Sequence, residues 1–229
     1  MSNDLINIYE ILPKHLQTKS IIDKKTNMKI GNGHIIIVGG SGCGKTSLLV
    51  NMIRLQHNVW NHITLITPNS KEPLYMFMKE KIPEDQFTII EDLKLLPKPE
   101  EYINNGTCLI IFDDLVCEKN SKPIEEYFIR SRKVGNLKGG SITCAYLTQS
   151  WFQTPITLRR NCAYIIIKEL CRKQDALQII KDFSLTTPKD KLLDAFEKYT
   201  NGLLNFIMID TRAPQGQKIR HNFNEILNL

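Results

Sequence analysis

The sequence predicts an α/β protein in which a mostly parallel central sheet carries helices on both faces. Short apolar, β-branched runs alternate with segments compatible with helices, which is typical of βαβ units. Several of these runs are apolar at every position, as expected for strands that helices cover on both sides. The first run, Ile35–Val38, leads directly into a glycine-rich loop and then into a helix-compatible segment. The 229 residues suit one large domain with small additions.

The expected elements follow the apolar runs and the capping signals. Thr187 before Pro188 predicts the start of the last helix, and Asn201-Gly202 predicts its end. Ser121 and Pro123 suit the start of another helix. We expect strands at 35–38, 63–67, 87–90, 108–112, 141–147, 163–167 and 204–209, and helices at 45–56, 74–81, 121–132, 172–182 and 188–199.

Three parts of the chain differ in composition. Residues 1–34 read as a short N-terminal addition that ends in the turn Gly31-Asn32-Gly33. Residues 35–210 hold all the expected helices and strands of the domain. Residues 211–229 read as a polar, basic tail with a short amphipathic end.

Composition limits the class of protein. Hydrophobic residues make up 42% of the chain, which is enough for a substantial core. No apolar run approaches the ~20 residues of a membrane span, so we expect none. The six cysteines form no C-x-x-C pair, which favours reduced core residues of an intracellular protein over disulfides or a zinc site. The net charge of +6 permits contact with nucleic acid but is equally compatible with an ordinary basic surface.

The glycine-rich loop fits the phosphate-binding pattern G-x-x-x-x-G-K-[ST] in the strand–loop–helix context that the pattern requires. Glycines allow backbone N–H groups to curl around phosphate oxygens, and the helix that follows points its positive end at the same anion. The lysine can reach the β- and γ-phosphates, and the threonine hydroxyl can bind Mg²⁺. A glycine-rich turn without a ligand is the weaker reading. The predicted ATP-binding residues are Gly39, Gly40, Ser41, Gly42, Cys43, Gly44, Lys45, Thr46 and Ser47.

Two carboxylates end the apolar run Cys108–Phe112. Ligands of such sheets lie at the carboxyl ends of the strands, so this end faces Lys45. Asp113 fits the second protein ligand of Mg²⁺, and Asp114 is placed to act as general base on the attacking water. An exposed turn after a buried strand is the alternative for an Asp-Asp pair, and the phosphate-binding loop upstream favours the functional interpretation.

Gln149 ends the next strand, where its amide can sense the γ-phosphate or orient water; a surface turn residue is nearly as compatible with the sequence. Arg130, Arg132, Arg159 and Arg160 flank this strand, and any of them could serve as an arginine finger towards a neighbouring subunit. Taken singly, each is more simply a solvated helix charge. The chain lacks an Asn-Lys-x-Asp segment for reading guanine, which points away from GTPases and to ATPases with an added strand and a catalytic acid.

The order of these segments resembles the FtsK/HerA-type genome-packaging ATPases of large DNA viruses, including the poxvirus enzyme, and of virophages. The likeness covers about residues 35–167, and its segments beyond the phosphate-binding loop are Leu109–Asp114, Tyr127–Lys133, Tyr146–Ser150 and Leu158–Asn161. It implies a P-loop NTPase of the ASCE, RecA/FtsK-HerA-like class that hydrolyses ATP with Mg²⁺.

The same resemblance implies that Asp113 binds Mg²⁺, Asp114 is the catalytic acid, Gln149 is the sensor, and Arg132 or Arg160 acts in trans. The chain departs from the family in having Ser131-Arg132-Lys133 where Gly-Arg-His is more frequent. Membership implies a homo-oligomeric ring that threads double-stranded DNA into a preformed capsid. The implied partners are double-stranded DNA and capsid vertex proteins, and the implied location is the viral factory in the host cytoplasm, with association with the virion also open.

Two other functions compete with a DNA translocase. A P-loop nucleoside or nucleotide kinase would need an arginine-rich lid, which the sequence does not show. A nucleotide-binding protein without hydrolysis would lack an equivalent of Lys45 or Asp113, and both are present. DNA contact would depend on the loops at 119–122 or 133–138 and would be to phosphates, although both loops also read as solvated turns.

Overall fold

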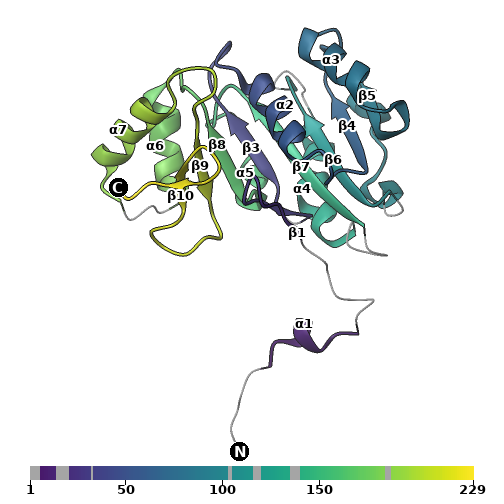
Figure 1. Cartoon of the computed structure of the whole chain (residues 1–229), viewed down its shortest axis with the longest axis horizontal. Helices are drawn as coiled ribbons and strands as arrows, with labels where there is room; N and C mark the ends of the chain where they lie inside the picture. Colours follow the sequence, from purple (N-terminus) through teal and green to yellow (C-terminus); the bar gives the residue numbers. More distant parts are fainter. Residues whose placement is uncertain are drawn as a thin grey trace, which may run out of the picture.

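A nine-stranded sheet forms the centre of the protein, in the order β11-β10-β9-β8-β3-β7-β6-β4-β5 (Figure 1). The structure is a computed structural model that describes residues 6–13, 21–31, 33–102, 105–115, 120–134, 140–183 and 187–229. The strands of the sheet are β3 (Ile35–Val38), β4 (His62–Ile66), β5 (Phe87–Ile90), β6 (Thr107–Phe112), β7 (Ser141–Thr148), β8 (Tyr164–Ile167), β9 (Ile207–Asp210), β10 (Ile219–His221) and β11 (Glu225–Ile226). The α-helices are α1 (Ile8–Ile11), α2 (Lys45–Leu55), α3 (Pro73–Lys81), α4 (Lys122–Val134), α5 (Ile156–Asn161), α6 (Lys173–Asp182) and α7 (Lys189–Tyr199).

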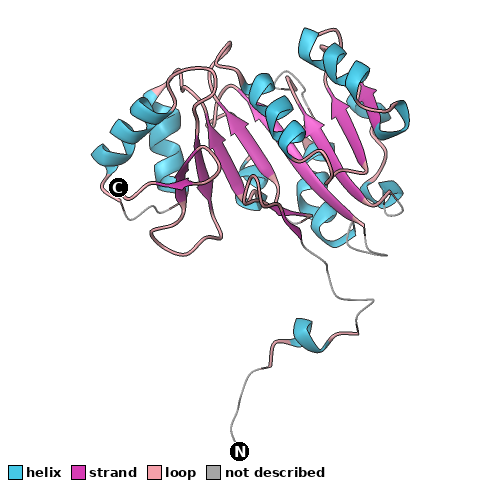
Figure 2. Cartoon of the chain, viewed as in Figure 1, coloured by secondary structure: helices cyan, strands magenta, loops and turns pink. Residues whose placement is uncertain are grey.

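The strands from β8 to β5 are parallel, as predicted, and β9, β10 and β11 are added in antiparallel orientation (Figure 2). β7 lies between β3 and β6, so the strand that ends at Gln149 separates the strand of the phosphate-binding loop from the strand of the two aspartates. This is the added strand that the ATPase interpretation required. Because the six parallel strands point the same way, their carboxyl ends share one edge of the sheet.

Helices cover both faces, and each face has its own hydrophobic core. Side chains alternate along β3, so Ile36 and Val38 belong to one core and Ile35 and Ile37 to the other. The first core contains buried residues of α4, α5, α6 and α7, and the second contains those of α2 and α3. This two-sided burial explains why the strands read as continuous apolar runs.

Segments near both ends of the chain pack against the central sheet and its two cores. β1 (Ile21–Ile22) and β2 (Lys29–Ile30) form a hairpin whose following residue Gly31 donates from its backbone N–H to Thr143 Oγ1 at 2.9 Å. Residues beyond 210 were expected to form a polar tail. They instead form β10 and β11, because Ile219, Phe223 and Leu227 are apolar side chains that the fold buries. The last expected strand starts at Ile207 rather than at 204, since a turn occupies 202–205.

No helix in the described part of the chain combines the length and the apolar character that crossing a membrane requires.

Candidate active site

The phosphate-binding loop connects β3 to α2 and is fixed on both sides. Gly39 N–H donates to the carbonyl of Thr148 at 3.2 Å, and Gly40 N–H donates to the carbonyl of Glu169 at 2.8 Å. Gly42 and Gly44 have φ angles of 75° and 87°, a left-handed backbone that strains residues with a Cβ. The ends of β7 and β8 therefore hold the loop at the N-terminus of α2, where an anion is favoured.

Lys45 lies across this loop. Its Nζ donates to the carbonyl oxygens of Gly39 at 2.9 Å and of Gly40 at 2.8 Å. The side chain is half-buried, so its charge is held close to the loop. This position agrees with the predicted role, because a triphosphate that enters the loop meets a cation already in place.

Asp113 directly follows β6 at the same edge of the sheet. Its backbone N–H donates to the carbonyl of Ile66 on β4 at 3.0 Å, and its carboxylate accepts a hydrogen bond from the Tyr75 hydroxyl on α3. Burial raises the pKa of Asp113 above its usual range, the hydrogen bond from Tyr75 opposes this effect, and the charge of Asp114 adds to it. A half-buried carboxylate of this kind gains from a cation nearby.

Glu72 is a third carboxylate at this edge, and sequence reasoning did not identify it. It immediately precedes α3, one turn before Tyr75. Burial raises the pKa of Glu72, as do the charges of Asp113 and Asp114, whereas the neighbouring Thr46 hydroxyl lowers it through a hydrogen-bonding interaction. Glu72 therefore lies beside both predicted magnesium ligands, Thr46 and Asp113. Glu72 follows β4, which pairs with β6. The sequence would have pointed to Glu72 only if this strand order had been known.

Asp114 points into a different environment from Asp113. Its backbone is left-handed, with φ 58°, and its side chain is exposed. Asn69 Nδ2 donates to Asp114 Oδ2 at 2.6 Å. With Glu72 and Asn69, Asp114 lines an open cavity of about 700 Å³, which has room for water next to the carboxylates. Asn69 is a second residue that the sequence did not reveal.

Gln149 follows β7, the strand that lies between β3 of the phosphate-binding loop and β6 of the two aspartates. The exposed side chain shares a small cavity of about 190 Å³ with Gly40 and Ser41. The structure thus brings Gln149 to the loop, as the position of β7 next to β3 requires.

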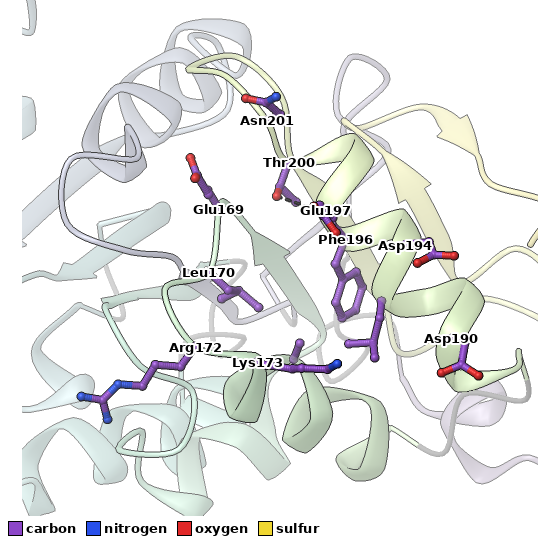
Figure 3. A pocket seen from close by; sticks show the side chains of 12 residues that line it. Glu169, Leu170, Arg172, Lys173, Asp190, Asp194, Phe196, Glu197, Thr200 and Asn201 are labelled. Carbon is purple, nitrogen blue, oxygen red and sulfur yellow. Dashed lines mark hydrogen bonds between the residues drawn. The ribbon is translucent and has the colours of Figure 1, made fainter.

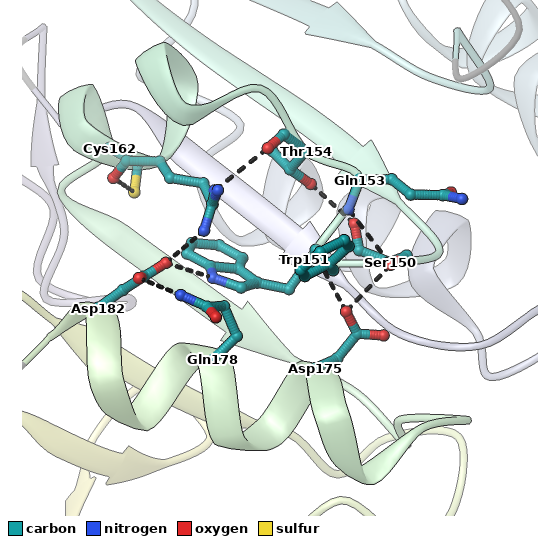
Figure 4. A network of polar contacts seen from close by, with 10 residues as sticks. Ser150, Trp151, Gln153, Thr154, Cys162, Asp175, Gln178 and Asp182 are labelled. Carbon is teal, nitrogen blue, oxygen red and sulfur yellow. Dashed lines mark hydrogen bonds and ion pairs between the residues drawn. The ribbon is translucent and has the colours of Figure 1, made fainter.

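A polar network fixes the segment after Gln149 (Figure 4). Asp175 at the start of α6 is buried, and it accepts hydrogen bonds from Ser150 Oγ at 3.0 Å and from the Phe152 N–H at 2.8 Å. Trp151 Nε1 donates to Asp182 Oδ2 at 2.9 Å, and Asp182 also pairs with Arg159 at 2.6 Å. The predicted sensor segment is thereby joined to both ends of α6.

The arginines differ in their surroundings. Arg159 belongs to this network, since it also donates to the carbonyl of Thr154 at 3.1 Å and lies over the Trp151 ring. Arg130 is paired with Glu100 and Glu126. Arg160 is exposed, and no hydrogen bond or ion pair joins it to the described part of the chain. The side chain of Arg132 lies outside the described residues, as do parts of both loops considered for DNA contact.

A cavity of about 610 Å³ between α6 and α7 is unsuited to a triphosphate (Figure 3). Four carboxylates line it, and only two basic side chains oppose them. The carboxylates are Glu169, Asp190, Asp194 and Glu197, and the basic residues are Arg172 and Lys173. This comparison favours the loop with Lys45 as the candidate phosphate site.

The residues present fit a nucleotide with Mg²⁺. Mg²⁺ in nucleotide sites takes one or two protein ligands and completes its shell with phosphate oxygens and water. Thr46 and Asp113 supply a hydroxyl and a carboxylate at the end of the phosphate-binding loop, and Tyr75 fixes the carboxylate.

Solved structures show the same fold. The genome packaging NTPase B204 from Sulfolobus turreted icosahedral virus 2, in complex with ATP-gammaS, is 16% identical with a TM-score of 0.58, covering 86% of this chain and 99% of that chain. B204, the DNA-packaging ATPase from Sulfolobus turreted icosahedral virus, is 17% identical with a TM-score of 0.57 over 86% and 98%. The pCW3 conjugation coupling protein TcpA with ATPgS is 10% identical with a TM-score of 0.53 over 97% and 69%.

The search among curated proteins finds no match. The sequence family described as poxvirus A32 protein matches residues 22–209, which is most of the chain. This match confirms the resemblance drawn from the order of the motifs. The chain belongs to the poxvirus A32 protein family.

Proposed function

We propose that this protein is an ATP-hydrolysing motor that translocates double-stranded viral DNA into a preformed capsid. One observation carries the enzymatic part of the proposal. Three separate segments meet at the carboxyl ends of the parallel strands: the start of α2 with Lys45 and Thr46, the end of β6 with Asp113, and the end of β7 with Gln149. Such an arrangement serves phosphoryl transfer, in which positioning and charge stabilisation do most of the work.

The side chains have distinct roles in this proposal. The loop N–H groups and Lys45 bind the β- and γ-phosphates, and Thr46 with Asp113 holds Mg²⁺. The metal ion, when bound, neutralises charge on the phosphate oxygens. Asp114 takes a proton from the attacking water as general base, and Asn69 fixes the orientation of its carboxylate. Gln149, at the end of β7 between the loop strand and the aspartate strand, contacts the γ-phosphate end.

The proposal of DNA packaging is supported by family membership and by relatives of the same fold. B204 is described as a DNA-packaging ATPase and as a genome packaging NTPase, and its structures hold ATP analogues. This chain spans nearly the whole length of B204. We infer a ring of identical subunits around duplex DNA, docked on capsid vertex proteins in the host cytoplasm.

The experiment that tests the proposal is ATP hydrolysis with and without duplex DNA, on protein whose mass is measured by light scattering. We expect DNA to stimulate hydrolysis by an oligomer. Lys45→Ala should abolish nearly all turnover and weaken ATP binding, because the ammonium neutralises phosphate charge. Turnover that DNA leaves unchanged, in a monomer, would contradict a motor.

The proposed ring also predicts a role in a neighbouring subunit's ATP site for Arg160 or Arg132. If one of them completes a neighbour's site, its replacement by alanine should preserve ATP binding and lower turnover by about 10³–10⁵-fold. Mixing these subunits with Lys45→Ala subunits should restore part of the activity, since some intact loops then face intact arginines. An arginine that acts in its own subunit gives no such rescue in rings shown to exchange subunits.

A further inference from the structure

The turn 202–205, between α7 and β9, lies against the phosphate-binding loop. β9 is antiparallel to β8, so its start is at the edge where the parallel strands end. A Cβ placed on Gly44 would lie 3.2 Å from Leu203 Cδ2 and 3.4 Å from Leu203 O. The turn is therefore in contact with the N-terminus of α2, where the triphosphate is expected.

The strand order gives the nucleotide a direction. β6 with Asp113, and β7 with Gln149, lie on one side of β3, whereas β8 and β9 lie on the other. The γ-phosphate end belongs with Asp113 and Gln149. The base then leaves the loop towards β8 and β9, which is the side of the turn 202–205.

A buried lysine holds this turn in place. Lys168 is 0% exposed, and its Nζ donates to the carbonyl oxygens of Gly202 at 3.0 Å, Leu203 at 2.8 Å and Asn205 at 2.7 Å. The Cβ of Lys168 also contacts Gly39 closely enough to leave no room for a side chain there. Lys168 thus joins the turn to the phosphate-binding loop as one unit.

The turn directs its polar groups inward and its apolar groups outward. Three of its carbonyls are bound to Lys168, and Asn205 Nδ2 donates to the carbonyl of Asn201 at 2.7 Å. The side chains of Leu203 and Leu204 are 64% and 72% exposed. Two adjacent leucines left open on a rigid turn next to a phosphate site can cover the flat face of a base.

We propose that Leu203 and Leu204 form the surface on which the purine base of the bound nucleoside triphosphate rests, and that Lys168 positions this surface. The proposal rests on the proposed function for the presence of a nucleotide and names where its base binds. Leucine side chains offer no hydrogen-bond donor or acceptor to the edge of the base. Contact is apolar, so ATP and GTP should bind within about tenfold of each other, because strong discrimination requires buried polar groups that pair with the base.

The test compares two probes, ATP and inorganic tripolyphosphate, by titration calorimetry on the full chain. The variant is Leu203→Ser with Leu204→Ser, and the control is Leu95→Ser. Leu95 has a matching exposure of 71% and follows β5, which is the outermost strand at the end of the sheet opposite to β9. All three leucines are exposed, so these substitutions should leave the fold intact, which circular dichroism checks.

We expect the double variant to bind ATP about tenfold more weakly and to bind tripolyphosphate as the parent does. A tenfold loss is about 1.4 kcal/mol, which corresponds to roughly 55 Å² of apolar surface no longer buried. The control should bind both probes normally, and the Michaelis constant of the double variant should rise at an unchanged kcat.

Equal weakening of both probes would overturn the proposal, because the turn would then act only through the phosphate loop. Unchanged binding of both would overturn it too, and a lower oligomeric mass in that case would assign the leucines to a subunit interface. If the variants show the expected pattern of binding but the parent protein hydrolyses no ATP, the proposed function is contradicted and the base-binding surface is still supported.

Discussion

Replacing Lys168 by methionine should cost the protein a large share of its stability. Methionine keeps the length and apolar stem of the lysine, so the packing against Gly39 is retained. What is lost is the ammonium that donates to Gly202, Leu203 and Asn205. Sequence alone gives no hint of this, because a lysine after an apolar strand usually points into water.

The size of the effect follows from these three hydrogen bonds. A buried acceptor that loses its donor costs about 1–3 kcal/mol. The turn is close to the surface, so water can reach part of it, and the low end of this range applies to each carbonyl. Burial lowers the pKa of Lys168, which shows that its charge is held against a desolvation cost that the substitution relieves. The free energy of unfolding should therefore fall by about 3 kcal/mol or slightly less.

Urea denaturation followed by circular dichroism measures this change, and thermal unfolding should show a Tm lower by about 6–12 °C. The matched control is Lys79→Met, which removes an exposed lysine of α3 and should change stability by less than about 0.5 kcal/mol. Equal stabilities for the two variants would refute the reasoning, since the ammonium of Lys168 would then contribute no more than a solvated one.

Three further predictions concern the site and its partner. Asp114→Asn should bind ATP but turn over roughly 10²–10⁴-fold more slowly, as expected for loss of a general base. Glu72→Gln should lower turnover by less than about tenfold, because glutamine still hydrogen-bonds to Thr46. Rapid-quench kinetics measure both rates, and a larger loss for Glu72→Gln than for Asp114→Asn would assign the base to Glu72. Asp113→Asn should raise the Tm of the nucleotide-free protein by about 2 °C. The raised pKa of Asp113 means that the folded state binds the proton more tightly than the unfolded state, so the carboxylate charge is destabilising at neutral pH. In the parent protein, stability therefore grows as pH falls towards that pKa. A Tm that falls instead would contradict this sign. Binding of duplex DNA, followed by fluorescence anisotropy, should be independent of sequence and weaken steeply with salt, because phosphate contacts release counterions; a footprint confined to one sequence at high salt would count against translocation.

Residues close together in the sequence made the phosphate site predictable. Gly39 to Thr46 is one continuous segment, and its geometry depends on glycine and on the start of a helix. Asp113 was predictable for a related reason, since an apolar strand that ends in a carboxylate places it at the ligand edge. Both inferences need only the chain direction of parallel strands, which the alternation of strands and helices already indicated.

Glu72, Asn69 and Lys168 could not be found in this way. Each lies just beyond a strand, in a loop whose role depends on which strand is its neighbour in the sheet. Glu72 and Asn69 reach the aspartates only because β4 pairs with β6. Lys168 is buried only because β9 returns antiparallel to β8 and brings its preceding turn over the lysine. Strand order results from packing of the whole chain, which local sequence patterns do not encode.

The structure also separates two adjacent arginines, Arg159 and Arg160, which only the family resemblance had distinguished at the sequence level. Arg159 holds Asp182 and covers Trp151, so its charge is used inside the subunit, whereas Arg160 on the same short helix faces outward. Trp151 follows Gln149 by two residues. Because Asp182 binds both Trp151 and Arg159, the sensor segment and the helix that carries Arg160 are tied to the same end of α6. In the proposed motor, these contacts would connect a displacement of Gln149 by the γ-phosphate to Arg160, and coordinated hydrolysis around the proposed ring requires such a connection between sites.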